Sequence, residues 1–114
     1  MPSRLTIPLT ILLSCGVLAA QAWAASTRGV GLHDDYITFT TSSAPHGTIT
    51  FNVNNHGLNT HTFNIKRVST GRVLFQSGRI GSGGHISVTK TLQAGRYRIY
   101  CTIHAGMFKI FTVT

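Results

Sequence analysis

Three side chains with metal-binding atoms follow one another at intervals of three near the C-terminus. They are Cys101, His104 and Met107, which lie within one seven-residue segment. Thiolate, imidazole and thioether groups are the soft or borderline donors that copper prefers, and none of them suits Mg²⁺ or Ca²⁺. The segment therefore predicts a soft-metal site that still lacks one strong ligand.

His61 is the candidate for the missing ligand. It alternates with Phe63 and Ile65 along a predicted strand, which places the three side chains on one inward face. A Cys-x-x-His pair alone is usually accidental, and Cys101 taken alone fits a buried hydrophobe, a metal ligand or a nucleophile. Two His, one Cys and a weak axial Met together are the ligand set of a blue-copper electron-transfer site.

Residues 36–114 resemble the small blue (type 1) copper proteins of the cupredoxin family, such as plastocyanin, pseudoazurin and amicyanin. The resemblance follows residues 51–57, 61–63, 84–92 and 95–101, together with His104 and Met107.

This resemblance implies that His61, Cys101 and His104 are the equatorial ligands of one copper ion and that Met107 is its axial ligand. It also implies that electrons pass through the edge of His104. The family often has Asn directly after the first His, where this chain has Thr62. We expect the Thr62 hydroxyl to join the two ligand-bearing loops.

Short strands separated by turn residues must position these donors. Apolar and polar side chains alternate, and clusters of Gly, Pro, Asn and Ser lie between the alternating segments. The expected strands are residues 36–40, 47–54, 61–65, 86–92, 95–101 and 108–113. The pattern predicts an all-β fold, an antiparallel Greek-key β-sandwich, in a single domain. The resemblance implies that this sandwich is cupredoxin-like.

The N-terminus is predicted to be a signal peptide, residues 1–24, which precedes a copper-binding domain of residues 25–114. Arg4 stands before an apolar run, and Ala22 and Ala24 occupy the positions where signal peptidase requires small residues. Cleavage after Ala24 places the protein in the periplasm or outside the cell.

An uncleaved membrane anchor and a lipoprotein signal are weaker alternative interpretations of this segment. The apolar run, residues 5–20, is shorter than the about 20 residues that a membrane span needs, which disfavours an uncleaved anchor. Cys15 loosely resembles a lipoprotein acceptor, but the apolar run continues past it. Removal of the signal leaves Cys101 as the single cysteine.

Carboxylates are scarce in this chain and basic side chains are plentiful. The 114 residues contain 10 Lys and Arg against only Asp34 and Asp35, for a net charge of +8. Two adjacent carboxylates nearly exclude glycoside hydrolysis and a carboxylate cage for Mg²⁺ or Ca²⁺. The positive charge favours an acidic redox protein or an anionic membrane surface as partner, and an exported protein rarely meets nucleic acid.

The predicted function is the transfer of single electrons by an exported monomer that is not an enzyme. Storage or delivery of copper is the alternative, which fast exchange of the ion with a chelator would favour. Catalysis ranks lower because the sequence offers no second cluster of His. A metal-free adhesion sandwich would leave Cys101 unexplained.

Overall fold

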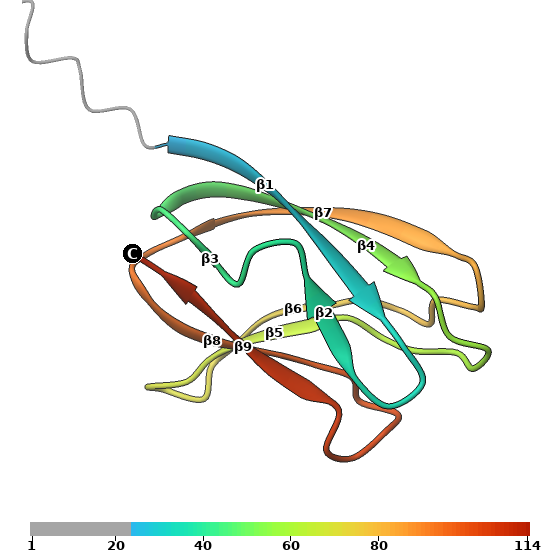
Figure 1. Ribbon diagram of the computed structural model, residues 1–114. Helices are drawn as coiled ribbons and strands as arrows, with labels where there is room; N and C mark the ends of the chain where they lie inside the picture. Colours follow the sequence, from blue (N-terminus) through green and yellow to red (C-terminus); the bar gives the residue numbers. More distant parts are fainter. Residues whose placement is uncertain (1–23) are drawn as a thin grey trace, which may run out of the picture.

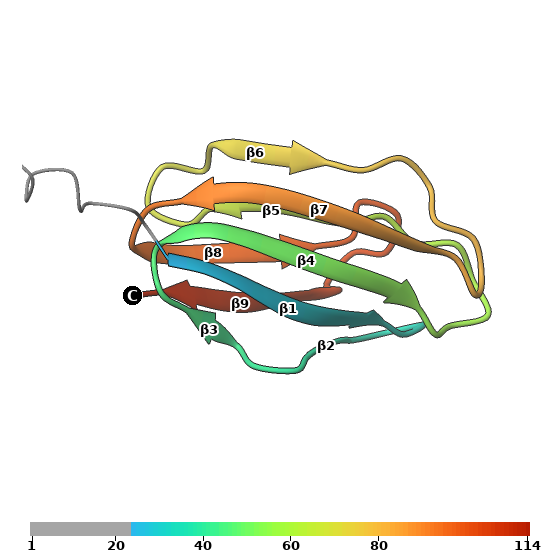
Figure 2. The ribbon, with the colours of Figure 1, turned by 90° about the horizontal axis from the view of Figure 1, so that it is seen from above.

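The computed structural model describes residues 24–114, which form strands in two packed sheets (Figure 1). The strands are β1 (Ala24–Leu32), β2 (Ile37–Phe39), β3 (Ser43–Ala44), β4 (Gly47–Asn55), β5 (Asn64–Arg67), β6 (Val73–Gln76), β7 (His85–Leu92), β8 (Gly95–Tyr100) and β9 (Phe108–Val113). One sheet has the order β2-β1-β4-β7, and the other has the order β3-β9-β8-β5-β6. Figure 2 shows the strands of the two sheets running roughly along one common axis.

The predicted β-sandwich is confirmed, and the chain crosses from one sheet to the other after β2, β3, β4, β6 and β7. Most neighbouring strands are antiparallel, but β1 runs parallel to β4 and β3 runs parallel to β9. The peripheral strands β2 and β3 are brief, with three and two residues.

Strand β1 is not predicted from the sequence, because its small residues show no alternation. It forms through tertiary pairing, in which each of its nine residues faces one residue of β4. A Cβ at Gly29 would lie 2.8 Å from Thr40 Cγ2, so the close approach of the segment after β2 favours glycine there. The short strands β3 and β6 likewise lack a sequence pattern of their own.

The hydrophobic core lies between the two sheets, where the predicted alternation is confirmed. Ile49, Phe51 and Val53 of β4 are all 0% exposed. The ring of Phe51 lies 5.7 Å from that of Phe63 and 5.2 Å from that of Phe111, in the opposite sheet. Each such side chain contributes about 1.5–3 kcal/mol by its burial.

Strand β5 starts three residues later than the predicted strand at residues 61–65. His61 forms only an isolated bridge, exchanging backbone hydrogen bonds of 3.1 and 2.8 Å with Ile80. The ladder is interrupted between this bridge and β5, because the Phe63 N–H donates to the Ser77 hydroxyl at 2.8 Å instead of to a backbone carbonyl.

The pairing of β5 with β8 decides where the predicted ligands meet. Asn64, the first residue of β5, faces Tyr100, the last residue of β8. The residues just before β5 and just after β8 therefore lie at the same end of the sandwich. His61 and Cys101 stand in these two positions, 40 residues apart in sequence.

Residues 1–23, which hold nearly all of the predicted signal peptide, lie outside the described residues, and β1 begins at Ala24. Within residues 24–114 there is no helix that has the length and apolar character needed to cross a membrane.

Candidate metal centre

His61, Cys101 and His104 bring two nitrogens and one sulfur together at this end of the sandwich. The two histidine Nδ1 atoms are 3.1 Å apart, and Cys101 Sγ lies 3.9 Å from His61 Nδ1 and 3.7 Å from His104 Nδ1. A triangle with these sides has a circumradius of about 2.1 Å, close to the ~2.0–2.3 Å that imidazole nitrogen and thiolate sulfur keep from a bound metal. The three donors therefore fit one ion between them.

The loop after β8 carries three of the four predicted ligands. The Cys101 N–H donates to the Met107 carbonyl at 3.1 Å and the Met107 N–H donates to the His104 carbonyl at 3.2 Å, which closes the loop on itself. Gly106 has φ +84°, a conformation that L side chains rarely adopt. Met107 is 3% exposed, and its role as the axial ligand stays a prediction.

Hydrogen bonds to sulfur prepare Cys101 to act as a thiolate. Burial raises the pKa of the thiol, but the hydrogen bond from the Thr62 N–H, the contact with the His61 ring and the hydrogen bonds from the backbone N–H groups of Ile103 and His104 together lower it by more. The pKa falls to about 6. Cys101 is 5% exposed and is the free cysteine of the described chain. A buried thiol with this lowered pKa beside two imidazoles favours the prediction of a metal ligand over that of a small hydrophobe.

Thr62 joins the two ligand-bearing segments, as the sequence predicts. Its Oγ1 lies 2.8 Å from the Thr102 hydroxyl and accepts hydrogen bonds of 2.9 Å from the Thr102 backbone N–H and from Asn64 Nδ2. Its own N–H donates to Cys101 Sγ at 3.4 Å. One residue therefore connects the sulfur, the loop after β8 and the start of β5.

Asp34, in the turn between β1 and β2, is a site residue that the sequence does not predict. Backbone hydrogen bonds from Asn59 and then Leu58 hold the pKa of its carboxyl below the ordinary value. Its Oδ1 lies 3.2 Å from His61 Nε2. Because a carboxylate only accepts, Nε2 carries the proton and Nδ1 keeps a lone pair for a metal. The available signal was that this strongly basic chain has only two carboxylates.

Asn55 is a second residue whose role only the structure shows. It is 2% exposed, and its Nδ2 donates to the carbonyls of Asn59 and Ile80 at 2.8 and 2.9 Å. Its Oδ1 accepts a 2.8 Å hydrogen bond from the Gly57 N–H. These bonds hold the segment between β4 and His61 in one conformation.

The surface near the centre carries exposed apolar side chains from three different loops. Tyr36, Leu58 and Ile103 are 53%, 86% and 40% exposed. Exposed apolar side chains gathered on several loops favour contact with another molecule. His104 is half-buried, whereas His61 is 0% exposed, so His104 is the imidazole that can reach this surface.

The other histidines do not join the donor group. His56, which is near His61 in sequence, lies with its ring 5.4 Å from that of His33. His33 stacks on Tyr36 at 4.3 Å. Among residues 24–114, the group of His61, Cys101 and His104 is the one set of three His, Cys, Asp or Glu donors close enough to share an ion.

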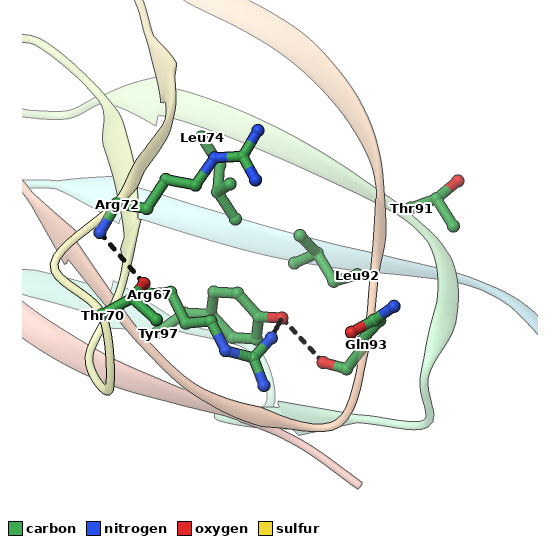
Figure 3. A pocket seen from close by; sticks show the side chains of 8 residues that line it. All are labelled: Arg67, Thr70, Arg72, Leu74, Thr91, Leu92, Gln93 and Tyr97. Atoms are coloured by element: carbon green, nitrogen blue, oxygen red, sulfur yellow. Dashed lines mark hydrogen bonds between the residues drawn. The ribbon is translucent and has the colours of Figure 1, made fainter.

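A cavity of about 330 Å³ lies at the opposite end of the sandwich, where β5 ends and β8 begins (Figure 3). Arg67 donates hydrogen bonds of 2.8 Å to the Tyr97 hydroxyl and to the Ala94 carbonyl, and the Tyr97 hydroxyl donates to the Gln93 carbonyl at 2.7 Å. The polar groups of Arg67 and Tyr97 are thus occupied within the fold. The cavity contains none of the predicted ligands.

Comparison with known proteins supports the same fold. No family model matches the chain, and the search of curated proteins found no match. Auracyanin A, a blue copper protein from the green thermophilic photosynthetic bacterium Chloroflexus aurantiacus, aligns with a TM-score of 0.63 at 16% identity, covering 80% of this chain and 100% of that chain.

Two further solved structures have similar folds. Amicyanin from Paracoccus versutus aligns with a TM-score of 0.57 at 18% identity, covering 83% of each chain. A multicopper oxidase aligns with a TM-score of 0.59 at 16% identity, covering 78% of this chain but 42% of that chain. The chain has the cupredoxin fold, and the resemblance read from its sequence is confirmed at the level of the fold.

Proposed function

We propose that this chain is a mononuclear type 1 copper protein that shuttles single electrons between redox partners. The observation that carries the proposal is the triangle of His61 Nδ1, Cys101 Sγ and His104 Nδ1, with sides of 3.1, 3.7 and 3.9 Å. Soft sulfur and imidazole donors in this number suit copper. Copper held there would supply a centre that alternates between Cu(I) and Cu(II).

The contribution of the chain is to hold the donors still and to give electrons a short way out. The hydrogen bond that Asp34 accepts from His61, the hydrogen bonds of Thr62 and those within the closed loop position the donors, so little rearrangement accompanies a change of charge. His104 is half-buried beside the exposed Ile103. A partner that packs against this apolar surface comes close to one ligand without reaching the sulfur.

A copper titration of residues 25–114 tests the proposal. We expect Cu(II) to produce an intense thiolate-to-copper absorption band, and voltammetry to show one reversible electron per chain with the metal retained. A colourless protein would overturn the proposal. Rapid loss of the ion to a competing chelator, without reversible redox, would instead support storage or delivery of copper.

We further propose that an acidic redox partner binds near the basic residues of the five-stranded sheet. Seven of the nine Lys and Arg in residues 24–114 lie on the five-stranded sheet or in the loops after β5 and β6, while Arg28 and Lys90 belong to the other sheet. The Arg98 guanidinium lies 3.9 Å from the centre of the Phe108 ring and the Lys66 ammonium 5.1 Å from that of Tyr100. Tyr100 and Phe108 are the last residue of β8 and the first residue of β9, the strand ends between which the loop with Cys101 and His104 lies.

Matched charge variants test this placement. We expect electron exchange with an acidic redox protein to slow as salt rises, and to slow further in Lys66→Gln and Arg98→Gln. Lys90→Gln, which removes the same charge from the other sheet, serves as the control. Equal effects from all three variants would contradict a localised site. Binding to anionic lipid vesicles, without salt-dependent exchange, would favour a membrane surface instead.

We further propose that the protein acts after export, in the periplasm or outside the cell. The support is the signal-like segment of residues 1–24, with Ala22 and Ala24 before the cleavage position. Mass spectrometry of the exported protein should find Ala25 as its first residue. An uncleaved or lipid-modified chain would replace this proposal by an anchored form.

A further inference from the structure

A carboxylate lies behind one of the proposed ligands. Asp34 Oδ1 is 3.2 Å from Nε2 of His61, and His61 Nδ1 faces Cys101 and His104. The His61 side chain is 0% exposed and that of Asp34 is 39% exposed. One imidazole therefore spans the distance between an anion and the donor triangle.

The carboxylate is itself held by two separate segments. The Leu58 N–H donates to Oδ2 at 3.1 Å and the Asn59 N–H donates to Oδ1 at 3.0 Å. On the other side, the turn that carries Asp34 is closed by a 2.9 Å hydrogen bond from the His33 N–H to the Tyr36 carbonyl. Asp34 is thus built into the fold and is not a mobile surface charge.

Gly57 leaves the space through which this carboxylate reaches the ring. A Cβ at this position would overlap Asp34 Oδ1 and would lie 3.1 Å from His61 Nε2. The absence of a side chain at residue 57 and the contact between Asp34 and His61 therefore depend on each other.

We propose that Asp34 is a positioning residue for the metal centre: it fixes the orientation and tautomer of His61, and its negative charge favours the more highly charged state of the bound copper. The inference rests on the proposed function. A ligating histidine that donates its second N–H to a carboxylate becomes a more basic ligand, and loss of such a partner typically costs about 10–100-fold in metal affinity.

The adjacent aspartate provides a matched control. Asp34→Asn and Asp35→Asn remove the same charge from neighbouring positions, but only Asp34 contacts His61. We expect Asp34→Asn to weaken Cu(II) about tenfold more than Cu(I), which raises the reduction potential by about 59 mV. Asp35→Asn should change the potential much less. Equal shifts in the two variants would show a general charge effect and would overturn the inference.

A second pair of variants separates charge from position. Asn at residue 34 can still accept a hydrogen bond from Nε2, whereas Ala cannot. In the metal-free protein, ¹⁵N NMR should show His61 with its proton on Nε2 in the native chain and in Asp34→Asn, and a mixture of tautomers in Asp34→Ala. Gly57→Ala, which displaces the carboxylate, should resemble Asp34→Ala. An unchanged tautomer in both would contradict the positioning role.

These readouts separate the inference from the proposed function. If the native chain gives no blue copper band, the proposed function fails, while the tautomer of His61 in the metal-free protein still reports on Asp34. If the native chain is blue and Asp34→Asn matches Asp35→Asn in potential and affinity, the inference fails and the proposed function stands.

Discussion

The two sides of the metal centre are held in different ways. The anchored half consists of His61 with Asp34, Asn55 and Thr62, and it draws on segments far apart in the sequence. The loop half consists of Cys101–Met107, seven consecutive residues closed by their own backbone hydrogen bonds. His61 is 0% exposed, whereas His104 is half-buried.

For the proposed electron-transfer site, this difference separates two requirements. The anchored half keeps a ligand fixed during the change of charge, which requires many contacts with a rigid body. The loop half must bring a ligand to the surface, where a partner can approach. A short loop does this because its tip contacts little else, and Thr102, Ile103, Ala105 and Gly106 are all exposed.

The largest effect should come from Cys101, whose sulfur lies 3.9 Å from His61 Nδ1 in the anchored half and 3.7 Å from His104 Nδ1 in the loop half. In Cys101→Ser the thiolate is lost, so we expect the thiolate-to-copper band to disappear completely, as the visible spectrum after Cu(II) addition will show. Met107→Leu, which leaves His61, Cys101 and His104 in place, should keep a coloured site. A persistent blue band in Cys101→Ser would overturn the assignment of the sulfur ligand.

Replacement of each histidine by glycine tests the comparison directly. Both variants should lose the native spectrum. Added imidazole should restore the blue colour in His104→Gly, because that position is half-buried at the surface, at concentrations that leave His61→Gly unchanged. Titration of each variant with imidazole provides the measurement. Equal rescue would mean that the two halves are equally accessible.

The stability of the metal-free protein should depend on pH through Cys101. Its pKa is about 6 in the folded chain against an ordinary value of 9.0, so between these values the unfolded chain binds more protons. The free energy of unfolding therefore rises from pH 6 to pH 9, and this stabilisation is lost as the pH falls through 6. Denaturation of the native chain and of Cys101→Ser should give a difference that grows over this range. A constant difference would contradict the lowered pKa.

The smallest effect concerns the connection between the halves. Thr62→Val removes the oxygen that accepts from Thr102 N–H and Asn64 Nδ2, and the buried groups left without it should cost about 1–3 kcal/mol of stability. Thr102→Val, at an exposed position, should cost at most about 1 kcal/mol. Chemical denaturation compares the two. A larger loss in Thr102→Val would show that the loop half supplies the connection.

Local patterns were enough to predict much of the fold. Strand β4 places Ile49, Phe51 and Val53 inward as its alternation predicts, because one buried face makes a period of two visible in the sequence. Strand β1 contains Gly and small residues and shows no such period. It is a strand because it pairs with β4 on one side and with β2 on the other. Interruption of the ladder by Ser77 could not be read from residues 61–65 either.

The chemistry of the proposed centre can be predicted from local sequence, because Cys101, His104 and Met107 lie within one loop and the apolar neighbours of His61 predict that it points inward. Tertiary structure alone decided what holds that chemistry in place. Asp34 reaches His61 across 27 residues and Asn55 reaches Ile80 across 25. Contacts over such separations leave no local periodicity, because they depend on how two sheets and their loops pack together.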